Sequence, residues 1–503
     1  MTERRSFADL GLMEMPRRGA RADAATPVGG LRIDSRAVGS GDLFVAIPGT
    51  RIDGAEFAQF AVRQGAVGVV ATEAGAARLA HDLGGLPVPV FLDPEPRRVL
   101  ARLAGRFWPA APAVIAAVTG TNGKTSTVHF LRQIWAHAGH PAASLGTTGI
   151  SAPGFAEPLQ QTTPDALVIH ERLADLAARG VTHAAIEASS HGLAQYRLDG
   201  LLLSAGGLSN ITRDHLDYHP SFEDYVAAKL RLFRELLPLG ATAVLNADDP
   251  AFAEAREAAT ARGLRILTVG RAETADLRIT QQRYLAHGQL LGLAWEGVRH
   301  DLELRLVGAF QAENVALAAG LALATEIPAR TVFAALPDLT GVRGRMERVA
   351  TRANGAAIFV DYAHTPDALA SAVDALRPHI GGRLVVVFGA GGDRDPGKRP
   401  EMGAAVATRA DLAIVTDDNP RSEDPAAIRG QVMAGCPDAT EIAGRAEAIL
   451  AGVDALDRPE DGLLIAVKGH ETGQEIAGTV HPFDDAEQAR AAVGALDAPA
   501  WAD

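Results

Sequence analysis

The sequence is poor in the features that mark secreted, membrane-spanning or nucleic-acid-binding proteins. It contains one cysteine, Cys436, so no disulfide can form within the chain, and this suits a reducing compartment. Residues 1–18 lack the continuous apolar core of a signal peptide, and no segment approaches the apolar length that spans a bilayer. The net charge of −13 argues against a general nucleic-acid surface. We therefore expect a cytoplasmic protein with no membrane span and no nucleic-acid partner, in which local cations can still bind a small anion.

The length and composition predict a globular protein of several domains. Its 503 residues exceed one ordinary core, and 47% hydrophobic with 22% charged residues is typical of a folded, water-soluble chain. The proline-rich bend at residues 108–112 indicates a linker, and a second α/β series begins after residues 336–341. We predict three α/β domains, at residues 1–108, 109–338 and 339–503.

Apolar runs of strand length alternate with helical patterns along the chain. This alternation predicts parallel sheets with helices on both faces. The predicted strands are Leu43–Ile47 and Val67–Ala71 in the first domain, Val114–Val118, Ala184–Glu187, Ala243–Leu245 and Ile266–Val269 in the second, and Ala357–Val360, Leu384–Phe388, Leu412–Thr416 and Leu463–Val467 in the third.

The string GTNGKT stands between a predicted buried strand and a helical pattern over Thr127–Trp135. A glycine-containing turn there lets backbone N–H groups surround a polyphosphate, and the helix N-terminus adds partial positive charge. Lys124 would reach the outer phosphates and the Thr125 hydroxyl would bind Mg²⁺. The usual first glycine falls at Val118, so the motif is shortened, and a plain glycine turn beside a lysine is the alternative. We predict a nucleoside-triphosphate site at Gly120, Thr121, Asn122, Gly123, Lys124, Thr125 and Ser126.

Polar clusters follow five of the predicted strands, at the ends where parallel sheets collect ligands. They are Glu187–Gly192, Asp361–His364, Gly389–Asp395, Asp417–Arg421 and Lys468–Glu471. One such cluster is often only a turn. Five such clusters across two domains predict that these strand ends bind ligands.

With these motifs the chain resembles the Mur ligases, in particular those that add the third residue to the peptidoglycan stem peptide. The strings that carry the resemblance are individually weak but strong in their order and spacing. They are GTNGKT, Thr162-Thr163-Pro164, Glu187–Arg197, Asn210–His219, Tyr225–Lys229, Gly344–Glu347, Asp361–Asp367, GGDRDPGKRP, DDNPR and KGHE. The resemblance covers nearly the whole chain. It implies a central P-loop parallel-sheet domain flanked by an N-terminal UDP-binding α/β domain and a C-terminal Rossmann-like α/β domain.

The resemblance also implies ATP-driven amide synthesis between UDP-N-acetylmuramoyl-L-alanyl-D-glutamate and meso-diaminopimelate. The D-glutamyl γ-carboxylate would attack the γ-phosphate of ATP, and the diaminopimelate amine would then expel phosphate from the acyl phosphate. Such chemistry needs cations around the transferring group. The family's positions for two Mg²⁺ ions match Thr125, Glu187, His215 and Lys229, the last as a carbamate formed with CO₂. Its catalytic positions match Lys124, Glu187, His215, Lys229 and Arg345.

Binding positions carry over in the same way, and a monomer is expected. For the UDP-substrate they are Ser35, Thr162, Thr163, Ser189, Gln195 and Arg197; for ATP, beyond the loop, Asn314, Arg345 and Asp361; for diaminopimelate, Arg394, Asp418, Asn419, Arg421, Val467 and Glu471. Two positions depart from the family: it usually has Asn-Val at Gln311-Ala312 and often glycine at Val467. Arg421 is the expected ligand for the carboxylate that distinguishes diaminopimelate from lysine, because a guanidinium binds carboxylate through two parallel N–H bonds.

Plainer interpretations exist for three of these residues. Lys229, on the predicted helical segment Phe222–Leu236, could be a solvated helix lysine. His215 could be a hydrogen-bonded loop histidine, and Arg421 a surface arginine after a turn.

Other functions also remain open at the level of sequence. Arg345 and Asp361 could form an ion pair between domains, and Ser189-Ser190-His191 could suggest a serine nucleophile, although no G-x-S-x-G elbow surrounds it. A P-loop kinase or NTPase would share the phosphate loop but would not need the third domain's motifs. The lysine-adding ligase, the more distant folylpolyglutamate synthase and a non-catalytic scaffold descended from a ligase are the remaining alternatives.

Overall fold

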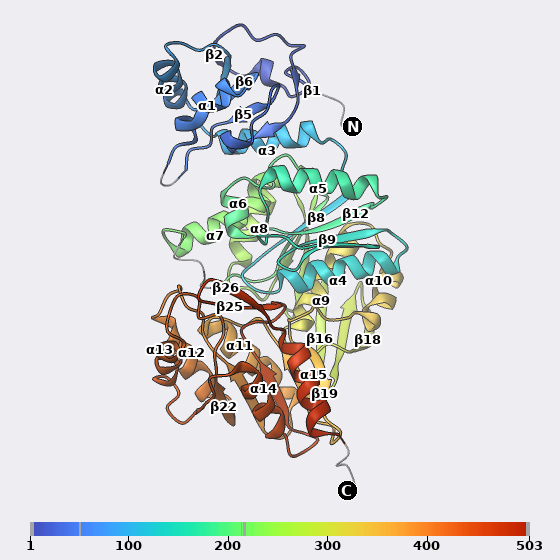
Figure 1. Cartoon of the computed structure of the whole chain (residues 1–503). Coiled ribbons are helices and arrows are strands. Elements are labelled where there is room, and N and C mark those ends of the chain that lie inside the picture. The colour runs from blue at the N-terminus through green and yellow to red at the C-terminus, as the bar shows by residue number, and fades with distance from the viewer. Residues whose placement is uncertain (1–4, 50–51, 213, 215–217, 499–503) are drawn as a thin grey trace. The chain divides into compact units, whose positions relative to one another are not determined.

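The structure, a computed structural model, describes residues 5–49, 52–212, 214 and 218–498. The chain folds into two compact units (Figure 1). The first unit comprises Met1–Lys124, Trp135–Leu267 and Ala324–Glu326, and the second comprises Thr125–Ile134, Thr268–Leu323 and Ile327–Asp503. The three-domain division stays a prediction.

A five-stranded sheet forms the N-terminal part of the first unit, in the order β2-β7-β6-β5-β4. Strands β4 to β7 are parallel, and β2 pairs antiparallel at the edge. The α3 helix starts at Pro96, which the first helical turn tolerates because its N–H would have no partner there. The elements are β2 (Arg17–Gly19), β4 (Leu31–Arg32), β5 (Leu43–Val45), β6 (Gly68–Ala71), β7 (Pro89–Leu92), α1 (Ala58–Arg63), α2 (Glu73–Leu83) and α3 (Pro96–Phe107). Both strands predicted here are confirmed as β5 and β6.

The first unit also contains strands of an eleven-stranded sheet with the order β11-β10-β9-β12-β8-β13-β14-β15-β16-β17-β18. Its strands β9, β12, β8, β13 and β14 pair in parallel, whereas the hairpin of β10 and β11 is antiparallel. All of β8 after Val114 is buried, and α5 covers one face of this sheet (Figure 1). The strands are β8 (Val114–Thr119), β9 (Ala142–Gly146), β10 (Gly149–Ala152), β11 (Phe155–Glu157), β12 (His183–Glu187), β13 (Ala205–Leu208), β14 (Thr242–Asn246) and β15 (Arg265–Gly270). The helices of the first unit here are α5 (Ala166–Ala178), α6 (Ser190–Ala194), α7 (Phe222–Arg231) and α8 (Phe252–Ala261), whereas residues Thr125–Ile134 of α4 (Lys124–His137) belong to the second unit.

An antiparallel meander of β16 (Leu277–Leu285), β17 (Gly288–Trp295) and β18 (Val298–Leu304) follows in the second unit. The sequence analysis did not predict it. Its second turn is the pair Glu296-Gly297, with φ of 48° and 79°, which is the two-residue hairpin geometry that matches strand twist. The helices α9 (Gln311–Ala324) and α10 (Ala329–Ala335) come next.

A six-stranded sheet organises the C-terminal part of the second unit, in the order β19-β20-β24-β21-β22-β23. Only β19 is antiparallel to its neighbour. Alternate strand residues face opposite sides, so Val386 packs toward α11–α13, whereas Val387 packs toward α14 and α15. The elements are β19 (Glu347–Thr351), β20 (Ala357–Val360), β21 (Leu384–Phe388), β22 (Leu412–Val415), β23 (Thr440–Glu441), β24 (Gly462–Ile465), α11 (Pro366–Leu376), α12 (Lys398–Ala407), α13 (Pro425–Met433), α14 (Arg445–Asp454) and α15 (Asp485–Leu496).

Three predicted strands end early in the structure. Those predicted to reach Ile47 and Thr416 end at Val45 and Val415. The strand predicted to reach Val467 ends at Ile465, because Val467 has a φ of 89°, outside any strand conformation. The predicted helical segment Phe222–Leu236 is confirmed, as α7 followed by a π-helical turn, Leu232–Leu236.

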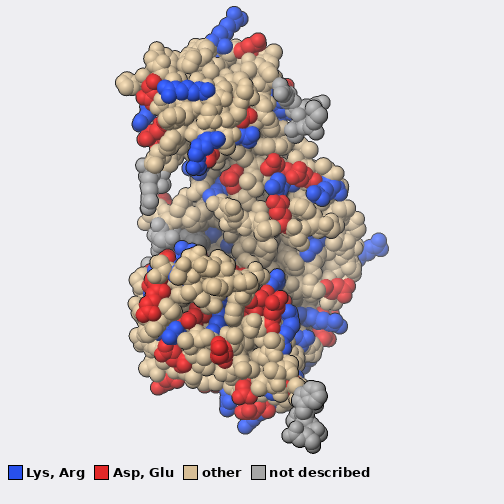
Figure 2. Space-filling model, viewed as in Figure 1, with Lys and Arg blue, Asp and Glu red and all other residues tan. Residues whose placement is uncertain are grey.

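Charged side chains of both signs are interspersed on the face that Figure 2 shows. Within the described part of the chain, no helix combines the length and apolarity needed to cross a membrane.

Candidate functional site

The predicted phosphate loop has the strand–turn–helix geometry expected of it. Gly120 and Gly123 have φ of 146° and 83°, a range that favours glycine, and they connect β8 to α4. The Lys124 ammonium folds back and donates to the carbonyl oxygens of Gly120 and Thr121, at 2.9 and 2.8 Å. Asn122 N–H is held by the Asn210 side chain at 3.0 Å. The loop is thus fixed by its own lysine and by the segment after β13.

Lys229 is buried against the same loop. Its side chain is 1% exposed and its ammonium donates to the Gly120 carbonyl at 2.7 Å. The Tyr225 ring lies 4.5 Å from this nitrogen, and the Tyr225 hydroxyl bonds Thr121 Oγ1 at 2.8 Å. Burial holds the pKa of Lys229 well below its usual range, and the nearby Lys124 charge lowers it further. The interpretation as a solvated helix lysine is therefore wrong, and a neutral amine is favoured here.

Glu187 lies at the carboxyl end of β12 and is 1% exposed. Its two oxygens accept from Thr147 N–H at 2.8 Å and Thr147 Oγ1 at 3.2 Å. A Cβ on Gly146 would lie 1.9 Å from Glu187 Oε1, so the chain must have glycine there to admit the carboxylate. Thr125 is 8% exposed at the start of α4. His215 lies outside the described residues.

Hydroxyl groups predicted to bind the UDP-substrate are brought together around the end of β12. Thr163 Oγ1 donates to Glu187 O at 2.7 Å and accepts from Ser189 N–H at 3.0 Å. Thr162 Oγ1 bonds Thr147 Oγ1 at 3.0 Å. Ser189 Oγ caps α6 by accepting from Gly192 N–H at 3.1 Å.

Arg197 and Gln195 extend this cluster. The Arg197 guanidinium donates to Thr163 O and to Gln195 Oε1, the latter at 2.8 Å through Nη2. Gln195 Nε2 donates to Tyr218 Oη at 3.0 Å. Ser35 lies apart, buried at the start of a 3₁₀ turn near the N-terminal sheet. Five of the six predicted positions therefore share one network, and Ser35 does not join it within the described contacts.

The residues predicted to contact ATP in the second unit lie on α9, just before β19 and just after β20. Asn314 is buried on α9, where its amide donates to Gln311 Oε1 at 3.1 Å. Arg345 places its guanidinium over the Tyr362 ring at 4.7 Å. Asp361 accepts from Met346 N–H at 2.7 Å, and burial raises its pKa while Arg345 opposes that rise.

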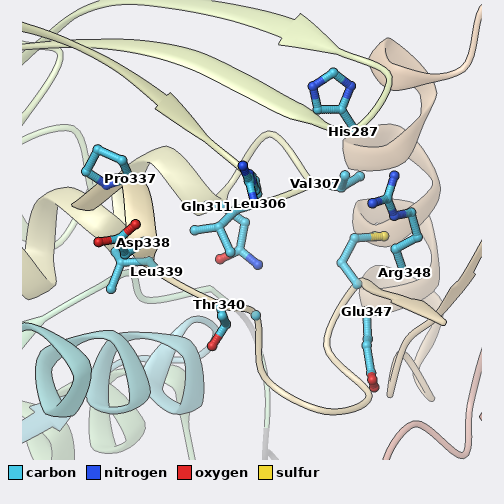
Figure 3. A pocket seen from close by; sticks show the side chains of 13 residues that line it. His287, Leu306, Val307, Gln311, Pro337, Asp338, Leu339, Thr340, Glu347 and Arg348 are labelled. Carbon is cyan, nitrogen blue, oxygen red and sulfur yellow. The ribbon is translucent and has the colours of Figure 1, made fainter. Parts of the chain in front are cut away.

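A pocket of about 310 Å³ opens beside Gln311 in the second unit (Figure 3). Figure 3 shows Leu306 and Gln311 on one side and Glu347 and Arg348 on the other. The remaining lining includes the connecting segment 337–341.

Three of the residues predicted to bind the amino acid meet around Lys468, which was not among the predicted site residues. Lys468 is 0% exposed, and its ammonium lies 2.9 Å from Asn419 Oδ1 and 3.5 Å from both Asp418 Oδ1 and Glu471 Oε2. Asn419 Nδ2 donates to Glu471 Oε2 at 3.0 Å. Lys468 is part of the KGHE motif, so that motif could have identified it as a site residue. Asp418, Asn419 and Glu471 are thus one network, whereas Arg394 is exposed on its loop.

Arg421 and Val467 are both held in the left-handed backbone region, with φ of 50° and 89°. The Arg421 guanidinium donates to Gly392 O at 2.8 Å and lies 3.2 Å from a Glu475 oxygen. Its side chain is 22% exposed, so it is partly buried and paired.

Arg445 contacts the backbone just after β22 and just after β24, and it was not among the residues predicted from the sequence. Its guanidinium forms a fully buried pair with Asp485, at 2.6 and 2.7 Å. It also donates to Ala466 O at 2.8 Å and approaches Asp417 O at 3.4 Å. One cation therefore fixes the backbone just before Val467 and just before Asp418.

The sequence matches three protein-family models in order along the chain. They are "Mur ligase family, catalytic domain" at residues 27–108, "Mur ligase middle domain" at 118–322 and "Mur ligase, glutamate ligase domain" at 344–469. A Bradyrhizobium diazoefficiens protein named UDP-N-acetylmuramoyl-L-alanyl-D-glutamate--2,6-diaminopimelate ligase is 52% identical over 475 residues, which are 94% of this chain and 96% of that protein.

Solved structures agree with this match. A structure of a UDP-N-acetylmuramoyl-L-alanyl-D-glutamate--2,6-diaminopimelate ligase is 34% identical with a TM-score of 0.73, covering 98% of this chain and 99% of that one. A MurF ligase from Thermotoga maritima in complex with ADP is 17% identical with a TM-score of 0.59, covering 92% and 96%. The second likeness concerns the fold alone.

Proposed function

Because this chain belongs to the Mur ligase family, we propose that it joins meso-diaminopimelate to UDP-N-acetylmuramoyl-L-alanyl-D-glutamate, with ATP converted to ADP and phosphate. The observation that carries the proposal is near-complete coverage at 52% identity by a relative named for this reaction. The product is a peptidoglycan precursor, made in the cytoplasm by a monomeric enzyme. The D-glutamyl γ-carboxylate first takes the γ-phosphoryl group, and the diaminopimelate amine then displaces phosphate to form the amide.

The phosphate loop supplies the cation for the first step. Lys124 presently donates to two loop carbonyls, and an incoming triphosphate offers its ammonium stronger, charged acceptors. The loop's N–H groups and Ser126 at the start of α4 then bind the remaining phosphate oxygens. From the second unit, Asn314 contacts the adenine, and Arg345 and Asp361 contact the phosphates and ribose.

The buried groups near this loop fit Mg²⁺. Glu187 is a buried carboxylate whose described partners are the two Thr147 donors and no cation, so a divalent ion would balance its charge. Thr125 supplies a hydroxyl, and His215 completes the set. Lys229 as an ammonium would repel the metal, but its burial favours the neutral amine that reacts with CO₂. The resulting carbamate offers the oxygen ligands that Mg²⁺ prefers. Bound Mg²⁺ would spread the charge of the transferring phosphoryl group.

The two other binding regions follow from the networks described. Ser35, Thr162, Thr163, Ser189, Gln195 and Arg197 hold the UDP-substrate. Asp418, Asn419, Glu471 and the Val467 carbonyl hold the amino acid, with Arg394 and Arg421 for its carboxylates. Lys468 sets the orientation of the Asn419 amide, because Asn419 Oδ1 faces the ammonium and its Nδ2 faces Glu471.

The decisive experiment is an amino-acid panel with the UDP-dipeptide and ATP. Phosphate release and the mass of the amide product are measured with meso-diaminopimelate, L-lysine and no amino acid. We expect amide formation with meso-diaminopimelate to be far faster than with L-lysine. Faster amide formation with L-lysine would assign the chain to the lysine-adding members, and phosphate release without an amide would indicate an NTPase.

A further inference from the structure

A hairpin that carries none of the predicted site residues packs against the Arg421 loop. Its strands are β25 (Gly473–Ile476) and β26 (Thr479–Pro482). Arg421 N–H donates to Glu475 O at 3.0 Å, and Ala477 N–H donates to Arg421 O at 2.7 Å. These two bonds bind the left-handed Arg421 backbone to the hairpin by main-chain contacts, which any side chain at position 475 would preserve.

The side chain of Glu475 makes a separate contact with the same arginine. Its Oε2 lies 3.2 Å from Arg421 Nε, and the two side chains are 40% and 22% exposed. The described hydrogen bond of the guanidinium goes instead to Gly392 O, at 2.8 Å from Nη1. The Glu475 carboxylate therefore already pairs with Arg421, the cation that binds a substrate carboxylate under the proposed function.

The Glu475–Arg421 contact changes the expected difference in binding free energy between diaminopimelate and lysine. With no internal anion, lysine would leave Arg421 unpaired in the closed site, which is a large penalty. With Glu475 present, Arg421 keeps a partner when lysine binds. Diaminopimelate must either displace Glu475 or place a second carboxylate beside it, and like charges at this range repel.

We propose that Glu475 is a specificity-determining residue, an internal counter-ion that the distal carboxylate of the amino-acid substrate displaces from Arg421. The inference rests on the proposed function. It follows that Glu475 lowers the discrimination between diaminopimelate and lysine below what Arg421 alone would give. A purely structural role for Glu475, in holding the guanidinium in place, predicts the opposite change when the charge is removed.

The test compares Glu475→Gln and Glu475→Ala with the wild type, in kcat and KM for both amino acids. Both variants keep the main-chain bonds to Arg421, and the glutamine keeps the side-chain shape. The matched control is Asp438→Asn, which removes one negative charge from an exposed position of the same unit. We expect KM for meso-diaminopimelate to fall about two- to fivefold with little change in kcat, because partly exposed ion pairs contribute about that much. We expect lysine to become a poorer substrate and the control to match the wild type.

Wild-type rates alone test the proposed function, whereas the ratio of variant to wild type tests Glu475. If the wild type makes the diaminopimelate amide and both Glu475 variants leave selectivity unchanged or reduced, the counter-ion role is refuted while the function stands. If the wild type prefers lysine, the proposed function fails, and the displacement proposed here fails with it.

Discussion

Replacing Arg445 by methionine should destabilise the second unit and weaken amino-acid binding together. Arg445 and Asp485 are both 0% exposed in their side chains, and two hydrogen bonds of 2.6 and 2.7 Å join them. Methionine fills a similar volume but leaves the Asp485 carboxylate buried without its cation. It also removes the donor from Ala466 O.

The structure sets the size of the expected loss. Breaking a buried ion pair by removing one partner costs about 3–5 kcal/mol. Asp485 is the first residue of α15, where the helix N-terminus offers partial positive charge, so we expect the lower half of that range. In a unit of this size about 3 kcal/mol lowers the unfolding midpoint by roughly 6–12 °C. Replacing both partners, in Arg445→Met/Asp485→Leu, should recover much of the loss, because an apolar pair leaves no charge uncompensated.

Calorimetry of the two single variants and the double variant closes a double-mutant cycle. KM for meso-diaminopimelate is measured on each folded protein at a temperature below all midpoints. We expect a coupling of about 2 kcal/mol or more between the sites and a raised KM in every variant that lacks Arg445. A loss below about 1 kcal/mol in Arg445→Met, or additive losses, would refute the reasoning from burial. An unchanged KM would show that the Ala466 and Asp417 carbonyls keep their places without Arg445.

Three further outcomes follow from the site and the core. Lys124→Ala should nearly abolish ligation in a protein that still folds, a loss of several kcal/mol in kcat/KM; retention of most of the wild-type kcat would contradict the phosphate-loop assignment. Lys229→Ala should be almost inactive and unresponsive to bicarbonate, and short carboxylates should partly restore it; ¹³C NMR of the wild type with labelled bicarbonate should show a carbamate signal that this variant lacks. Burial lowers the pKa of His170 in the folded protein to about 4. Between pH 6.5 and pH 4 the unfolded chain therefore binds one more proton than the folded chain, and the free energy of unfolding decreases as the pH is lowered. His170→Gln should reduce that acid-induced loss by about 2 kcal/mol between pH 7.5 and pH 5, checked from the unfolding midpoints at those two pH values.

Some parallel strands were predictable because they are short continuous runs of buried apolar residues, as in Leu384–Phe388, which the structure reproduces as β21. Others, such as β9 (Ala142–Gly146) and β13 (Ala205–Leu208), are rich in small residues and were not predicted. The β16–β18 meander was not, because strands such as Leu277–Leu285 mix polar and apolar residues and carry a bulge between Ile279 and Gln281. Its turn signal, Glu296-Gly297, was visible but weak.

The candidate site also contains residues that could be predicted from the sequence and residues that could not. Residues inside a motif, such as Lys124 and Asn419, could be selected from the sequence. Arg445 and Glu475 could not, because each acts on a motif that lies more than twenty residues away in the chain. Their roles depend on which strand ends the sheet brings near one another. The ends of β22 and β24 come near because only β21 lies between these strands in the sheet.

Val467 shows how such distant contacts sustain a local departure from the family pattern. A β-branched residue at a φ of 89° is strained, by about 1–3 kcal/mol, and glycine would avoid that cost. The strain persists because the residues on both sides are fixed: Ala466 O accepts from Arg445, and Lys468 is buried among Asn419, Asp418 and Glu471. The valine side chain is itself 5% exposed and packs in the core, which offsets part of the strain. The left-handed turn is therefore set by its neighbours' contacts rather than by the conformational freedom of the residue that adopts it.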